Sequence, residues 1–101
     1  MDTLHDLARR LDGAADALAR AGAALEGLAI DARVFGADVP GRLGEAGRAM
    51  HARWASALAA RIREAAAAGA RVSDTAQTVR VAAASYRDAD EVASRRHRRR
   101  T

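Results

Sequence analysis

Four leucines at seven-residue intervals constrain the first third of this chain to one kind of structure. They are Leu4, Leu11, Leu18 and Leu25. Because an α-helix brings such positions onto one narrow stripe, the spacing predicts a helix with one apolar seam. Asp6 suits its first turn, where the helix dipole favours negative charge. We predict this helix over about residues 4–34.

Three glycines interrupt the predicted first helix, at Gly13, Gly22 and Gly27. Each costs roughly 1 kcal/mol relative to alanine in a helix interior, and this cost has to be recovered by packing. We therefore expect a neighbouring element to approach this helix closely.

The helical pattern breaks at residues 35–41, which read Phe-Gly-Ala-Asp-Val-Pro-Gly. Gly36 can end the first helix and supply a positive φ, while Phe35 can plug the end of a hairpin. Pro40 suits the first turn of a following helix. Together with Gly41, these residues predict the hairpin turn at which the chain reverses.

A second and longer apolar pattern runs from Leu43 to near Val92, with spacings of mostly three or four residues. It predicts a helix over about residues 42–92. Gly69, followed by polar residues that could cap a new helix, leaves a kink or break near residues 69–74 open. The packing or partner seam of this helix consists of Trp54, Leu58, Ile62, Val72 and Val79.

These elements predict an all-α fold in which two long helices form an antiparallel hairpin over residues 1–93. Alanine dominates the apolar residues, and the three aromatics are Phe35, Trp54 and Tyr86. Trp54 is expected to anchor a core, either within the chain or between chains. Because one hairpin has little bulky material to bury, we expect it to pair with another into a four-helix bundle, as a homodimer or heterodimer.

The positive charge is concentrated at the C-terminal end. The formal net charge is +4, from 17 basic and 13 acidic residues. Five arginines occur in the last seven residues: Arg95, Arg96, Arg98, Arg99 and Arg100. Without these five, 12 basic residues face 13 acidic ones, so the remainder carries a charge of −1. We predict that residues 94–101 form a disordered, solvated tail, and nucleic acid is not the expected partner.

The sequence predicts no catalytic, cofactor-binding or metal site, so we do not expect an enzyme. There is no cysteine, and His5, His51 and His97 fall at separate points of the chain. No metal-binding or nucleotide-binding motif is present. No uncharged apolar run reaches the roughly 18 residues of a membrane span, and no Sec-type signal is recognisable. We therefore expect that any export uses a route without a cleaved signal.

One segment late in the second predicted helix carries the most information about function. It reads Tyr86-Arg87-Asp88-Ala89-Asp90-Glu91. Since Tyr86 and Asp90 are four residues apart, a helix presents the ring and the carboxylate on one face. A carboxylate so late in a helix opposes the helix dipole, so a purely local structural role explains it poorly.

This segment resembles the Tyr-x-x-x-Asp/Glu signal of the small ESX, or type VII, secretion substrates of actinobacteria. These proteins are WXG-like helical hairpins, and the alanine-rich run before Tyr86 is most similar to the EspC-like branch. The WXG branch carries Trp-x-Gly at its turn, whereas here Phe35 and Gly36 occupy that place.

The resemblance implies a secreted protein, transiently cytoplasmic, that leaves the cell as a folded dimer without a signal peptide. It further implies that Tyr86 and Asp90 form a secretion signal for the motor ATPase of the system. Two alternatives stay open on the sequence: a cytosolic coiled-coil adaptor, and a nucleic-acid-binding protein that uses the basic tail.

Overall fold

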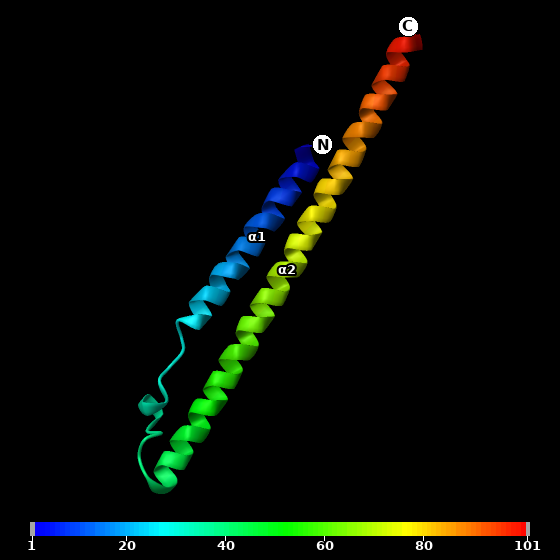
Figure 1. Ribbon diagram of the computed structural model, residues 1–101. Coiled ribbons are helices and arrows are strands. Elements are labelled where there is room, and N and C mark those ends of the chain that lie inside the picture. Colours follow the sequence, from blue (N-terminus) through cyan, green and yellow to red (C-terminus); the bar gives the residue numbers. More distant parts are fainter. Residues whose placement is uncertain (1, 101) are drawn as a thin grey trace. The chain divides into compact units, whose positions relative to one another are not determined.

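A computed structural model describes residues 2–100, and all regular structure in this range is helical (Figure 1). Helix α1 spans Asp2–Glu26, the short 3-10 helix η1 spans Ala32–Phe35, and helix α2 spans Gly41–Arg100. The 60 residues of α2 form one uninterrupted helix.

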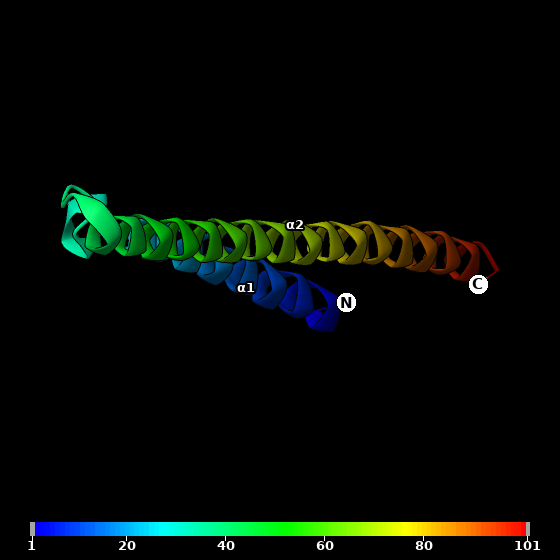
Figure 2. The same cartoon turned by 90° about the horizontal axis from the view of Figure 1, so that it is seen from below.

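The chain divides into two compact units, each built from part of α1 and part of α2. The first unit combines the chain up to Asp16 with the chain from Gly69 onward, and the second contains residues 17–68. In each unit the two helical segments run antiparallel, as Figures 1 and 2 show. The predicted all-α helical hairpin is therefore confirmed.

Alanines form the buried centre of the first unit. Ala8 is 2% exposed, and Ala76 and Ala83 are fully buried. Because alanine has no side chain beyond Cβ, two helices that meet at alanines can approach closely. Half-buried apolar residues flank this contact at Leu4, Leu11, Val72 and Val79.

The second unit places two glycines of α2 against the segment that connects the helices. Gly44 and Gly47 are buried. A Cβ atom at Gly44 would overlap the backbone carbonyl of Val39, and one at Gly47 would overlap that of Phe35. The connecting segment can therefore pack against the first turns of α2 only because these two positions lack side chains.

We expected a neighbouring element to approach α1 closely at its glycines, but neither Gly13 nor Gly22 is in such a contact. A Cβ atom at Gly13 would meet nothing within 4 Å, and one at Gly22 would make an ordinary contact of 3.8 Å with Ala65. The glycines that a close neighbour requires lie instead at the start of α2.

The first helix ends earlier than predicted, at Glu26 rather than near residue 34. Its last turn tightens, because the amides of Gly27 and Leu28 donate to carbonyls three residues back, at 3.1 and 3.0 Å. Asp31 then adopts an extended conformation, and its side chain caps η1 by accepting from the Arg33 amide at 2.9 Å. Local capping thus replaces the last two turns of the predicted helix.

The break left open near residues 69–74 is absent, because α2 is helical throughout this range. The threonine hydroxyls that follow bond back within the same helix. Thr75 Oγ1 donates to the Arg71 carbonyl at 2.9 Å, and Thr78 Oγ1 donates to the Asp74 carbonyl at 3.1 Å. The polar residues of this region therefore continue α2 and do not cap a new helix.

The predicted disorder of the basic tail is wrong for residues 94–100, which belong to α2. Neither glycine nor proline follows Gly69, so no residue type interrupts the helix. Cations in a last turn are also favoured by the helix dipole. Arg95 additionally pairs with Glu91 one turn earlier at 3.7 Å. Thr101 lies outside the described residues.

Candidate functional site

Tyr86 and Asp90 both lie on the exposed surface of α2 in the first unit. Tyr86 is 62% exposed, although Ala83, one turn earlier, is fully buried. Asp90 is also exposed and follows Tyr86 by one helical turn on the same face. In Figure 1 this part of α2, in orange, continues past the N-terminal end of α1. The ring and the carboxylate are therefore accessible to another molecule.

Two charged neighbours of Asp90, Arg87 and Glu91, have partners of their own. The guanidinium of Arg87 donates to Nε2 of His5 on α1. Glu91 pairs with Arg95 at 3.7 Å. Within residues 2–100, Asp90 itself makes no ion pair or side-chain hydrogen bond. Asp90 therefore presents an unpaired carboxylate on the same helical face as Tyr86.

An open recess of about 500 Å³ lies between α1 and α2 in the first unit, lined by His5, Asp6, Ala8, Arg9 and Arg80. Two ion pairs form at its edge, between Arg9 and Asp6 and between Arg80 and Asp12. The second of these joins the two helices. The Arg80–Asp12 pair therefore ties α1 to α2, whereas the Arg9–Asp6 pair lies within α1 and neutralises charge on that helix alone.

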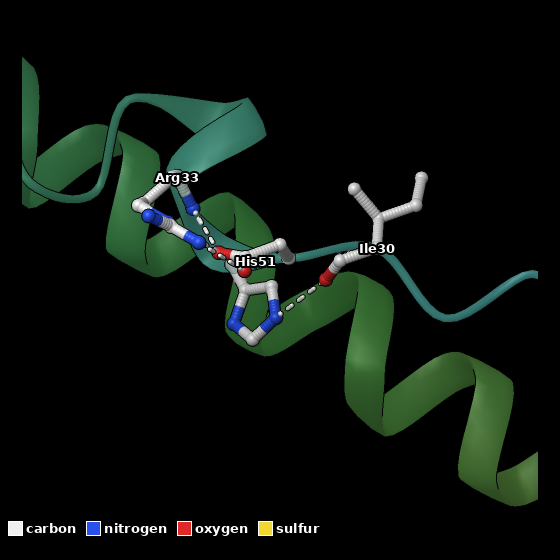
Figure 3. A network of polar contacts seen from close by, with 4 residues as sticks. Ile30, Arg33 and His51 are labelled. Carbon is white, nitrogen blue, oxygen red and sulfur yellow. Dashed lines mark hydrogen bonds and ion pairs between the residues drawn. The ribbon is translucent and has the colours of Figure 1, made fainter.

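A second group of polar contacts fastens the connecting segment, residues 27–40, to α2. Three α2 side chains at three-residue intervals make them: Arg48, His51 and Trp54. They reach backbone carbonyls of the connecting segment at 2.7, 3.0 and 3.0 Å, respectively. Figure 3 shows the His51 ring directed at the carbonyl of Ile30. The regular spacing of three donors at the start of α2 was the sequence signal for this arrangement, which sequence analysis missed.

The residues predicted for the hairpin turn lie in the connecting segment and at the start of α2. Gly36 has φ 78° and ends η1, and Gly41 has φ 80° at the first position of α2. Pro40 directly precedes α2. The ring of Phe35 meets that of His51 edge to face, with centroids 5.9 Å apart.

Asp31 is the titratable group whose environment is most clearly altered. Hydrogen bonds from the Arg33 side chain, and then from the Arg33 backbone amide, lower the pKa of the Asp31 carboxyl. The two side-chain bonds measure 3.3 and 3.1 Å. Ionised Asp31 therefore serves both as the cap of η1 and as the partner of Arg33.

Trp54 is not enclosed as a core anchor, because 38% of it remains exposed. Its indole Nε1 donates to the Leu28 carbonyl at 3.0 Å. Apolar depressions of about 170 and 240 Å³ lie along it, and both include Leu58. The remaining seam residues of the second unit are half-buried: Leu18, Leu25, Leu58 and Ile62. This seam is only partly covered within one chain.

Large apolar residues are exposed elsewhere as well, among them Leu28, Leu43 and Met50, at 50%, 70% and 58%. These exposed apolar side chains form a surface suited to contact with a partner.

The fold and these surfaces define a helical-hairpin protein with an exposed apolar face and an exposed Tyr-Asp pair. No family model, no curated protein and no solved structure matches the chain. No helix in the described part is apolar over enough length to cross a membrane. Across residues 2–100, no cluster of three histidine or acidic side chains could hold a metal ion.

Proposed function

We propose that this protein is a non-enzymatic substrate of a type VII secretion system and that Tyr86 and Asp90 form its export signal. The observation that carries the proposal is the 62% exposure of Tyr86 with unpaired Asp90 one turn later. A coiled-coil adaptor would be expected to bury this tyrosine in a seam. The exposed pair instead offers an aromatic ring for packing and a carboxylate for a basic site on the motor ATPase.

The test compares culture supernatant with cytosol in a host with and without its type VII motor ATPase. Wild-type protein is expected in the supernatant only when the motor is present. Tyr86→Ala and Asp90→Ala are expected to abolish export while helicity stays unchanged by circular dichroism. Asp88→Ala is the matched control, because Asp88 is an exposed acid two residues from Asp90 but on another face of α2. Normal export of both signal variants would overturn the proposal.

We further propose that the exposed apolar face pairs with a second helical hairpin, from another copy of this protein or from a different protein, to form a four-helix bundle. Partly exposed Trp54 and the exposed Leu28 and Met50 support this, since association would remove their apolar surface from water. Leu28→Gln with Met50→Gln is expected to shift the complex toward monomer in light scattering. An unchanged mass for the double variant would contradict the pairing surface.

A further inference from the structure

We propose that His5 is a positioning residue for the Tyr86 and Asp90 signal, because it holds the guanidinium of Arg87 away from the Asp90 carboxylate. The inference rests on the proposed export function and assigns a role to the first turns of α1. All four residues belong to the first unit of the chain.

Asp90 has a cation of its own helix within reach. Arg87 precedes it by three residues, and side chains three or four apart on a helix surface are neighbours that form ion pairs. The other carboxylate within reach of Arg87 is Glu91, which is already paired with Arg95 at 3.7 Å. Without a competing acceptor, Asp90 would therefore be the natural partner of Arg87.

The structure supplies that competing acceptor from the other helix. Arg87 donates to Nε2 of His5, which is separated from it by 82 residues in sequence. His5 is half-buried, and Ala8, one turn later on α1, is 2% exposed. Because Ala8 fixes this end of α1 against α2, His5 is held opposite Arg87 by the packing of the backbone.

The consequence concerns the charge that a basic binding site would meet. When the Arg87 guanidinium is hydrogen-bonded to His5, no intramolecular cation neutralises the Asp90 carboxylate beside Tyr86. If Arg87 were instead paired with Asp90, a partner would first have to displace this cation. Ion pairs on helix surfaces are weak, so the expected change in recognition is about twofold.

The experiment measures the initial rate of motor-dependent export for a set of full-length variants. His5→Ala is expected to lower this rate about twofold. The rate should be restored by His5→Gln, whose side-chain carbonyl can accept from Arg87. Removal of the cation in the double variant His5→Ala/Arg87→Ala should restore it as well. Circular dichroism and light scattering establish that each variant keeps the helicity and mass of the wild type.

Rescue by the double variant is the readout that a purely structural role of His5 would not give, because that variant also lacks the contact between the helices. Wild-type export of His5→Ala, with export still abolished by Tyr86→Ala, would overturn the positioning role and leave the signal intact. A double variant as slow as His5→Ala would overturn it as well. Normal export of both Tyr86→Ala and Asp90→Ala would overturn the signal and the positioning role together.

Discussion

The indole nitrogen of Trp54 donates a hydrogen bond to the backbone carbonyl of Leu28 at 3.0 Å, across 26 residues of sequence. This bond ties the chain just beyond α1 to the fourth turn of α2. Arg48 and His51 make equivalent bonds to carbonyls farther along the connecting segment. The segment is thereby ordered largely by side chains of α2.

Trp54→Phe is expected to lower the free energy of unfolding by about 0.5–1.5 kcal/mol, because it keeps an aromatic ring but removes the donor. The smaller values are favoured, since water can reach a site that is 38% exposed. Urea denaturation at a fixed protein concentration measures the change. Arg53→Lys, at an exposed position of the same helix, should leave the midpoint unchanged. Equal midpoints for Trp54→Phe and wild type would show that the bond contributes nothing.

Gly47→Ala is expected to destabilise the protein by about 1–3 kcal/mol, because its Cβ would overlap the Phe35 backbone. Gly13→Ala is the matched control. Its Cβ would meet nothing within 4 Å in the middle of α1, so alanine should stabilise that helix by about 0.5–1 kcal/mol. Thermal unfolding followed by circular dichroism distinguishes the two. Stabilisation by both variants would mean that the connecting segment does not pack on α2 as described.

Ala83→Leu is expected to cost about 1–3 kcal/mol, because Ala83 is fully buried where α1 meets α2 and a larger side chain would force the helices apart. Ala84→Leu provides a control at the adjacent, exposed position of the same helix. Its effect on the unfolding midpoint should be small. Equal effects of the two substitutions would contradict the alanine contact.

Asp31 should make the ordering of η1 depend on pH. Arg33 lowers the pKa of Asp31 in the folded chain. The stabilisation of the folded chain by ionised Asp31 is therefore fully present at pH values above 3.8, the ordinary pKa of this carboxyl. It is lost as the pH falls through the lowered folded value. The check compares the thermal midpoints of wild type and Asp31→Asn at pH 7 and pH 3. The advantage of wild type should shrink at pH 3, and an advantage that grew there would contradict the assigned cause.

Much of the helical framework could be predicted from local pattern. The heptad leucines of α1 and the apolar spacings of α2 predicted the two helices. The turn residues at 35–41 predicted where the chain reverses direction. Helix ends were predicted less well. α1 stops at Glu26 because Asp31 and Arg33 favour a separate cap, and α2 continues to Arg100 because nothing after Gly69 breaks it.

The contacts of the candidate site could be predicted only in part. The spacing of Tyr86 and Asp90 was enough to put them on one helical face. The approach of His5 to Arg87 was not predictable, because it depends on the register of two helices whose facing residues lie 82 positions apart. The same holds for the three α2 donors that reach the connecting segment.

By itself, the sequence determined that the chain forms two helices separated by a turn, because apolar periodicity and helix-breaking residues act locally. The tertiary structure alone decided that alanines form the contact in the first unit and that Trp54 stays partly exposed. The tertiary structure also decided that Arg87 donates to His5 of α1 and not to a carboxylate of its own helix. The Arg87 contact depends on the register in which α1 meets α2 in the first unit, where Ala8, Ala76 and Ala83 are buried. The exposure of Trp54 depends on how the connecting segment and α1 cover it in the second unit.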